Sequence, residues 1–229
     1  MIVGIMQPYL FPYIGYWQLV SAVDVFVIYD DVNFIKQGYI NKNYILINKE
    51  KKPFSLELLG ASSNKHINTI QVGRNSHKII KTIEQNYKKA QYFDNVFPLI
   101  EDILNQKEKN LAIFIAYSLE KISKYLDIDT KFVYSSSLKK NNDLKGEEKV
   151  IELCKQFKST QYINAIGGQK LYSKEKFKEQ NISLNFIDNQ LVKYAQFDND
   201  FIPYLSIIDI LMFNDIDKIK EMLGVYKLL

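Results

Sequence analysis

The sequence predicts an α/β fold in which a mainly parallel sheet is flanked by helices. Short apolar runs rich in β-branched residues, such as Ile2 to Met6 and Val25 to Tyr29, are typical of strands covered on both faces. Amphipathic helical segments alternate with such runs, and this alternation implies right-handed crossovers between parallel strands. With 229 residues and 47% hydrophobic content, the chain can bury one sizeable core, so we expect a single α/β domain over residues 1–229.

The N-terminal unit reads strand, loop, helix, strand. Between the first two strands, Tyr16 to Ala22 is long enough only for a short helix. Tyr44 to Leu58 resembles two strands around a lysine-rich turn, with Pro53 at the edge of the second, and therefore predicts a hairpin. A polar loop follows over residues 60–68, and then a short strand at Ile70 to Val72.

A helical insertion is expected at about residues 76–126. Apolar residues recur at three- and four-residue spacing in Ser76 to Asn86 and in Pro98 to Tyr125, which indicates amphipathic helices. Ser76 and Asn95 are the predicted N-cap residues.

After this insertion the α/β alternation resumes and completes a Rossmann-like sheet with C-terminal helices. Strands are expected at Lys131 to Tyr134, Gln161 to Asn164 and Ile182 to Phe186, and helices at Glu147 to Phe157, within Gly167 to Gln180, and twice in the C-terminal segment. Asp209 lies in an apolar helix, so it either faces solvent or is a buried acid with a partner.

Composition limits the classes of partner and compartment. Lys and Arg number 30 against 26 Asp and Glu, a net charge of +4 that permits an anionic ligand without requiring nucleic acid. Cys154 is the single cysteine, so no intramolecular disulfide can form, and we expect a buried, inert thiol in a reducing compartment. No apolar run approaches the roughly 18 residues that span a bilayer. We therefore expect a cytoplasmic protein.

Polar and aromatic residues are concentrated between Met6 and Asn43. Ligands of open α/β sheets bind beyond the carboxyl ends of the strands. We therefore expect one rim to carry the residues that follow the first two strands, namely Gln7, Tyr9, Tyr13, Tyr16, Asp30, Asp31 and Asn33. Asp30 and Asp31 are candidates for a general base, for sugar binding, for a metal ligand or for turn capping. Because neighbouring residues of a strand point to opposite faces, the two acids should not share one role.

Other residue types suit an anionic or ring-shaped ligand. Lys36, Asn41, Lys42 and Asn43 offer donors for phosphate or carboxylate oxygens, although a solvated loop has the same composition. The surrounding aromatic rings can stack on a base or sugar, or pack in the core.

Two weaker candidates lie farther along the chain. Gly167 and Gly168 stand between a strand and a helix, where backbone N–H groups can meet an anion or a tight turn can form. Histidine in general can exchange a proton near neutral pH, so His66 is a candidate for acid–base work, but a surface histidine is the alternative. The histidines and the cysteine have no metal-binding spacing, so no metal site is predicted.

Six blocks together resemble the WbqC-like family, in the same order and over essentially the whole chain: MQPYLFPYIGYWQL, VDVFVIYDDVNFIKQGYINKN, ASSNKHIN, QNYKKAQYF, YINAIGGQKLY and LSIIDILMFN. The resemblance implies a place in bacterial gene clusters for O-antigen (lipopolysaccharide) and related surface polysaccharides, and an activity as a glycine transferase. It adds Gly15, Asn64, Asn164 and Tyr172 to the candidate ligand-binding residues. His66 stands where the family commonly has an apolar residue, which argues against catalysis by His66.

A more distant likeness concerns nucleotidyltransferases and class I synthetases, whose first strand also leads through a turn into a helix. The two histidines of their HxGH turn would correspond to Tyr13 and Tyr16 around Gly15. Tyrosine, with a pKa near 10, brings no cation to a triphosphate at neutral pH. This substitution argues against adenylation by the standard route.

The candidate residues and the family resemblance together favour a transferase. It would move an aminoacyl group, with glycyl as the first candidate, or another acyl group to the amino group of a nucleotide-linked sugar. The partners would be that sugar and an activated donor, with nucleic acid involved only if the donor is an aminoacyl-tRNA. A nucleotidyltransferase-like enzyme that uses ATP and magnesium, and a non-catalytic module that binds nucleotide sugars, are the alternatives. The sequence identifies no cofactor.

Overall fold

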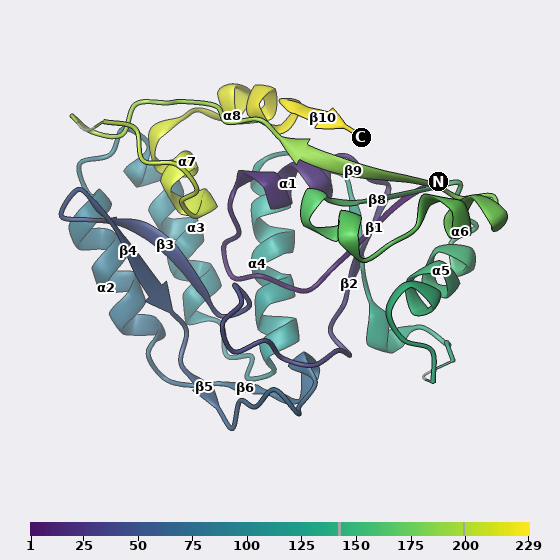
Figure 1. Ribbon diagram of the computed structural model, residues 1–229. Helices are drawn as coiled ribbons and strands as arrows, with labels where there is room; N and C mark the ends of the chain where they lie inside the picture. The colour runs from purple at the N-terminus through teal and green to yellow at the C-terminus, as the bar shows by residue number, and fades with distance from the viewer. Residues whose placement is uncertain (142, 199) are drawn as a thin grey trace.

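The computed structural model describes residues 1–141, 143–198 and 200–229, and in this part of the chain six strands form the central sheet (Figure 1). Their order is β10-β9-β8-β1-β2-β7, and all neighbours are parallel except the antiparallel pair of β9 and β10. The strands are β1 (Ile2–Met6), β2 (Val25–Ile28), β7 (Lys131–Tyr134), β8 (Gln161–Ala165), β9 (Ser183–Asn189) and β10 (Tyr226–Leu228). The predicted mainly parallel α/β fold is confirmed.

The chain enters the sheet at its centre. It moves outward from β1 through β2 to β7, then crosses to the other side of β1 and continues through β8 and β9. This is the strand order of a Rossmann sheet, and its switch point lies between β1 and β8. Met6 pairs with Ile28, and Ile28 with Tyr134, so three strands end at the same level of the carboxyl edge.

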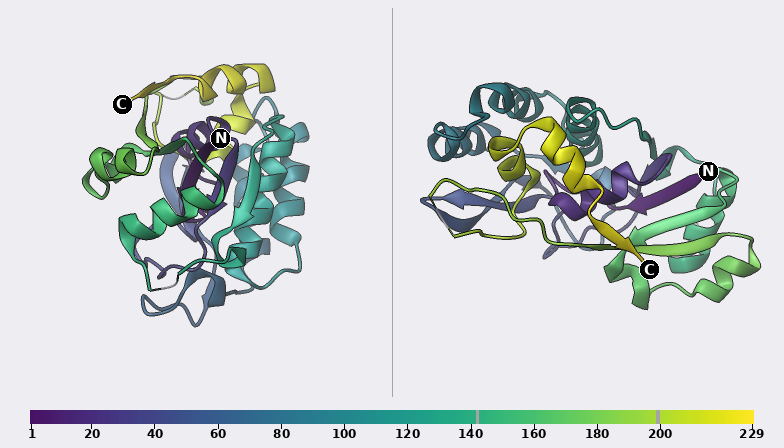
Figure 2. Two further views of the ribbon diagram at one scale, coloured as in Figure 1. Left: turned by 90° about the vertical axis from the view of Figure 1, so that its right-hand side faces the viewer. Right: turned by 90° about the horizontal axis from the view of Figure 1, so that it is seen from above.

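Helices cover both faces of the sheet (Figure 2). On one face, α1 (Ile14–Ser21) and α4 (Leu111–Tyr125) pack on Phe26 and Ile28. On the other face, α5 (Gly146–Gln156) and α6 (Lys174–Glu179) pack on Val25 and Val27. The alternation of these four residues along β2 is the period of a strand buried on both sides. Cys154 is buried on the second face, as expected.

The helical insertion contains α2 (Ser76–Tyr87), α3 (Phe93–Asn105) and α4. The segment expected to be helical from Pro98 to Tyr125 is interrupted at residues 106–110, where the Asn110 side chain accepts hydrogen bonds from the first backbone N–H groups of α4. The predicted caps were wrong. Asn75 precedes α2 and Tyr92 precedes α3, which begins before Pro98.

The remaining elements flank the sheet. β3 (Lys42–Ile47) and β4 (Glu50–Ser55) form the predicted hairpin, and β5 (Leu58–Leu59) pairs with β6 (Gln71–Val72). Short 3-10 turns are η1 (Ile67–Thr69), η2 (Ser135–Ser137) and η3 (Ile166–Lys170), and the predicted C-terminal helices are α7 (Ile207–Phe213) and α8 (Ile216–Leu223). Within the described residues, no helix has the length and apolar character to cross a membrane.

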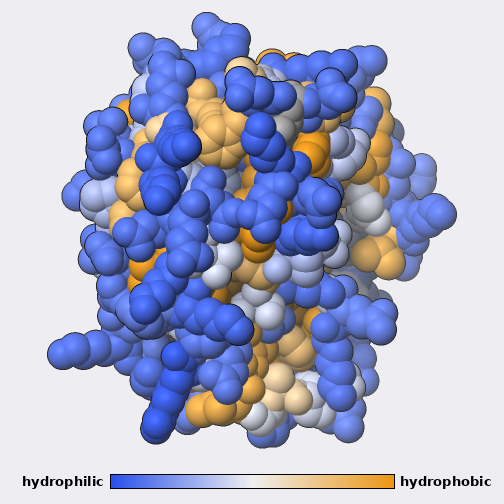
Figure 3. Space-filling view, turned by 90° about the vertical axis from the view of Figure 1, so that its left-hand side faces the viewer, coloured by the Kyte–Doolittle hydropathy of each residue, from blue (hydrophilic) through white to orange (hydrophobic). Residues whose placement is uncertain are grey.

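The face on the left of Figure 1, where the β3–β4 hairpin lies, is mainly hydrophilic, with hydrophobic side chains in small separate patches (Figure 3). Small patches of this kind are ordinary on a protein surface.

Candidate functional site

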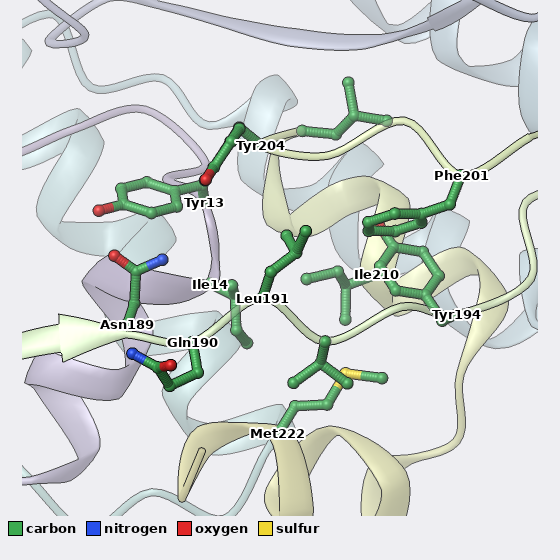
Figure 4. Close-up of a pocket in the computed structure, with 12 residues that line it drawn as sticks. Tyr13, Ile14, Asn189, Gln190, Leu191, Tyr194, Phe201, Tyr204, Ile210 and Met222 are labelled. Atoms are coloured by element: carbon green, nitrogen blue, oxygen red, sulfur yellow. The ribbon is translucent and has the colours of Figure 1, made fainter. Parts of the chain in front are cut away.

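A cleft of about 260 Å³ opens at the carboxyl edge of the sheet. Three separate parts of the chain line it: the loop after β1, the stretch from Tyr39 into β3, and the region from the end of β9 to the start of α7. We call it the tyrosine cleft, and its lining residues are Tyr9, Pro12, Tyr13, Tyr39, Asn43, Asn189 and Tyr204. Tyr13, Asn189 and Tyr204 also border a narrower apolar hollow toward Phe201 and Met222 (Figure 4).

The phenol rings give the tyrosine cleft flat walls with polar rims. The ring centroids of Tyr9 and Tyr39 lie 6.2 Å apart, and the side chains of Tyr39 and Tyr204 are about half exposed. Tyr204 has a φ of +57°, an uncommon value for a residue with a side chain. Apolar faces with a few hydroxyl and amide groups are typical of sites that bind a sugar ring or a base.

The loop after β1 is held in place through its carbonyl groups. Phe11 O accepts hydrogen bonds from Asn43 Nδ2 at 2.7 Å and from Ser206 Oγ at 2.8 Å. Pro12 O accepts from Trp17 Nε1 at 3.1 Å. Phe11 itself has a φ of +44°, a strained conformation that these bonds maintain. One wall of the cleft is therefore preorganised before any ligand arrives.

Gly15 makes room for the Tyr13 ring. Tyr13 precedes α1, and its ring lies so close to Gly15 that a Cβ there would be 2.6 Å from a ring carbon. Tyr16, one residue later, points into the core instead and donates a hydrogen bond to Gln7 O at 3.0 Å. Gly15 and Tyr16 thus support the cleft from behind, and neither is among its lining residues.

The Tyr9 and Tyr13 phenols are neutral at physiological pH. Burial, and secondarily the neighbouring tyrosines, raise the pKa of Tyr9 and of Tyr13 above the ordinary value of 10.0. The described residues that line the cleft include no carboxylate, imidazole or ammonium group. The cleft can bind and orient a neutral ring, but its lining supplies no general base.

Asp30 holds a turn through hydrogen bonds to its carboxylate. Its Oδ1 accepts from Ser136 N at 2.9 Å, and its Oδ2 accepts from Ser136 Oγ at 2.6 Å and from Asn68 Nδ2 at 3.3 Å. The side chain is buried and does not line the tyrosine cleft. These bonds fix the turn that follows β7 to the end of β2.

Asp31 has different surroundings. Its Oδ2 lies 2.8 Å from Lys140 Nζ and 3.4 Å from Lys149 Nζ, and Lys149 Nζ is 5.4 Å from the centroid of the Tyr29 ring. Burial would raise the Asp31 pKa, but hydrogen bonding and the two nearby cations hold the pKa below its ordinary value. We call Lys140 and Lys149 the lysine pair.

The end of β8 contributes a further group of candidates. Asn164 is buried, and a Cβ on Gly168 would lie 2.7 Å from its amide nitrogen, so this close packing requires glycine. Gly167 is exposed with open space around it. Tyr172 lies on the same face of the sheet as Tyr29 and contributes to the raised pKa of Tyr29, after burial and Asp31.

The other predicted residues lie outside the tyrosine cleft. Asn33 pairs with His66 in an isolated β-bridge, and both are exposed. Asn41 Nδ2 donates to Leu56 O at 2.8 Å, which fastens the start of the hairpin. Also outside the lining are Gln7, Lys36, Lys42 and Asn64. The structure thus brings Tyr9, Tyr13 and Asn43 together, but not Asp30 or Asn41 with them.

Sequence reasoning missed four residues of this edge. Asn189 could have been found, because it ends a strand at the same edge as the other candidates. Tyr204, Lys140 and Lys149 have no such local signal, because only the tertiary fold brings them to the site.

The WbqC-like protein family model matches residues 7–221, which include all of the tyrosine cleft and the lysine pair. The chain belongs to the WbqC-like protein family. This WbqC-like protein is 27% identical over 214 residues to the uncharacterized protein Rv1507c of Mycobacterium tuberculosis (strain ATCC 25618 / H37Rv). That alignment covers 91% of this chain and 92% of its relative. No solved structure matches the chain.

Proposed function

We propose that this WbqC-like protein is a transferase of bacterial O-antigen or related surface-polysaccharide biosynthesis. It would move an aminoacyl group, with glycyl as the first candidate, or another acyl group to the amino group of a nucleotide-linked amino sugar. The observation that carries the proposal is the tyrosine cleft at the carboxyl edge of a sheet with Rossmann strand order. Ligands of such sheets bind at this edge, near the switch point.

The dimensions of the cleft favour one ring of such a substrate. Pockets for drug-sized ligands have volumes of roughly 300–1,000 Å³, and the tyrosine cleft, at about 260 Å³, suits a single sugar ring or base. The rest of a nucleotide-linked sugar would then extend along the carboxyl edge.

The charges at this edge bear on the reaction. Amide formation joins the amine nitrogen to the carbonyl carbon of an activated donor, expels the leaving group and releases one amine proton. The lowered pKa of Asp31 makes it a weak base for that proton. We therefore propose that the protein acts mainly by positioning a neutral amine beside the donor, and that the departing group takes the proton.

The test begins with binding and proceeds to turnover. Nucleotides and nucleotide sugars are screened by thermal shift, since a ligand of the folded state raises apparent stability. Each ligand found is then incubated with glycine plus ATP, glycyl-tRNA or a glycyl thioester, and the sugar is analysed by mass spectrometry. A glycylated or acylated sugar is the expected product. Release of pyrophosphate from ATP and glycine alone would favour the nucleotidyltransferase-like alternative instead.

A matched pair of variants links any activity to the cleft. Tyr39→Ala removes a half-exposed ring of the lining, and we expect roughly tenfold weaker ligand binding because a stacked ring contributes about 1–3 kcal/mol. Tyr226→Ala removes a tyrosine from β10, outside the lining, and should leave binding unchanged. Equal effects of the two substitutions on ligand binding would contradict the assignment of the tyrosine cleft as the binding site.

One observation favours a second candidate, a non-catalytic module that binds nucleotide sugars. The described lining of the cleft contains only phenols, amides and a proline, and it includes no carboxylate, imidazole or ammonium group. Tight binding without turnover of any of the three donors would support this alternative.

A further inference from the structure

The lysine pair carries one more positive charge than its surroundings neutralise. Both ammonium groups approach a single carboxylate oxygen, Asp31 Oδ2, and the side chains of Lys140, Lys149 and Asp31 are only 2%, 10% and 13% exposed. Lys140 is well satisfied, because it also donates to Ser135 O. Among the described residues, Lys149 has only the long contact of 3.4 Å to Asp31 and the face of the Tyr29 ring.

Neighbouring acids are already engaged. Glu147, two residues before Lys149, pairs with Lys176 at 2.9 Å and also accepts from Ser173 N. Glu152 accepts from Asn141 N at 3.1 Å, and Asp30 is occupied by Ser136 and Asn68. Among the described residues, no second carboxylate forms an ion pair with Lys149. A cation withdrawn from water in this way is stabilised if a further anion joins it.

The location of the lysine pair is as informative as its charge. Tyr29 N donates to Met6 O at 2.9 Å, so Tyr29 and Asp31 lie beside the end of β1, where the loop to Tyr9 begins. Tyr29 packs on the α5 face of the sheet, whereas the tyrosine cleft is lined in part by Tyr9 and Tyr13 of the loop that leads into α1. The end of β1 therefore lies between the two sites at the carboxyl edge.

We infer that Lys149, supported by Lys140 and Asp31, binds a phosphate-type anion, namely the diphosphate of a ligand whose ring occupies the tyrosine cleft. This inference rests on the proposed function for the identity of the whole ligand. A nucleotide-linked sugar carries negative phosphates next to its rings, and the lining of the cleft has no cation for them. The lysine pair supplies that cation at the same edge.

Asp31 sets the net charge of this anion site. It holds Lys140 in place and cancels one of the two positive charges, which leaves a net charge of one for the incoming anion. Hydrogen bonding by the Ser135 side chain also helps to hold the Asp31 pKa low, so the carboxylate stays charged beside both lysines.

The test measures the binding of inorganic pyrophosphate by calorimetry in a buffer free of phosphate. Lys149→Gln should weaken binding roughly 10- to 100-fold, the loss typical of one charge-assisted hydrogen bond. Lys149→Arg keeps the charge and should retain most of the affinity. Lys155→Gln, an exposed lysine on the same helix, is the matched control and should have no effect.

Asp31→Asn provides a change of opposite sign. Removing the carboxylate leaves both lysines without their anion, so pyrophosphate should bind more tightly and raise the melting temperature of this variant more than that of the wild type. If the two lysines served only to neutralise Asp31, the wild type would not bind pyrophosphate and Lys149→Gln would change nothing. If Lys149→Gln does not fold, the pyrophosphate titration of Asp31→Asn serves as the test.

Parallel titrations separate this inference from the proposed function. Binding of pyrophosphate that depends on Lys149, without binding of any nucleotide sugar, would support the anion site and overturn the proposed substrate. Binding of a nucleotide sugar that depends on Tyr39 but not on Lys149 would support the proposed substrate and overturn the anion site. Binding of glycine or acetate, but not of pyrophosphate, at Lys149 would overturn the phosphate assignment.

Discussion

The substitution Asp209→Asn tests how the C-terminal region is fastened to the fold. Asp209 is fully buried in α7, as one of the two alternatives from the sequence required. Its Oδ1 accepts from Tyr87 Oη, and its Oδ2 accepts from Tyr194 Oη and Gln196 Nε2, each at 2.7 Å. Three parts of the chain thus meet at one carboxylate.

Tyr87 and Gln196 must donate at this position and cannot turn an acceptor toward an amide NH₂ group. Tyr87 Oη already accepts from Leu46 N at 2.9 Å, so its hydrogen must point to Asp209. Gln196 is fixed because its Oε1 accepts from Ile202 N at 2.7 Å. Whichever way an Asn side chain turns, its NH₂ group faces one of these donors. One buried donor left without an acceptor costs about 1–3 kcal/mol.

Urea unfolding followed by circular dichroism measures this cost as a change in the free energy of unfolding. We expect Asp209→Asn to lose about 1–3 kcal/mol. The control, Asp217→Asn, alters an exposed acid of α8 and should change stability by less than about 0.5 kcal/mol. A loss at residue 209 no larger than that of the control would refute the hydrogen-bond argument.

The pH dependence of this cost has a definite sign. Burial raises the pKa of Asp209 above its ordinary value of 3.8, against the opposing effect of its hydrogen bonds. The protonated form therefore stabilises the fold fully below that ordinary value, and this contribution is lost as pH rises through the raised pKa. The difference between wild type and Asp209→Asn should be larger in acid than at neutral pH. A difference that grows with pH would contradict the raised pKa and show that hydrogen bonding to the ionised carboxylate outweighs its burial.

Three further predictions concern the carboxyl edge. Asp31→Asn should show the opposite pH trend, because the lowered pKa of Asp31 gives stability that is present above pH 3.8 and is lost as pH falls through the lowered value. Urea midpoints measured at several pH values should therefore show a destabilisation that is confined to neutral pH. Asp30→Asn should destabilise by about 1–3 kcal/mol, since the Ser136 and Asn68 donors lose the buried carboxylate that accepts their hydrogen bonds, and an unchanged urea midpoint would refute this role. Tyr204→Gly relieves a positive φ and should stabilise the fold by up to about 1 kcal/mol. It should also weaken ligand binding in the tyrosine cleft, so tighter binding would show that the Tyr204 ring does not contact the ligand.

Much of the fold was predictable because its signals are local. The runs that became β1, β2 and β7 are short, apolar and β-branched or aromatic, and they were placed within one or two residues. The N-cap of α2 was placed one residue late because Asn75 and Ser76 are both polar, and only tertiary contacts, such as the hydrogen bond from Glu57 N to Asn75 Oδ1, decide between them. Strand β10 was missed because three residues are too few for a pattern.

The site was predictable only in its N-terminal part. The carboxyl-end rule found Tyr9 and Tyr13, and Asn43 was found from its polar neighbourhood. The same rule could not distinguish Asp30, which fixes a turn, from Asp31, which meets the lysine pair. That distinction depends on Ser136, Lys140 and Lys149, which are more than 100 residues away in sequence.

The anchoring of Phe11 by Ser206 has a consequence for biosynthesis. The hydrogen bond joins two residues 195 positions apart in the sequence, and Tyr204 lies next to that junction. A growing chain cannot close this contact until Ser206 has left the ribosome. The tyrosine cleft therefore cannot assemble while only the first half of this sequence has been synthesised.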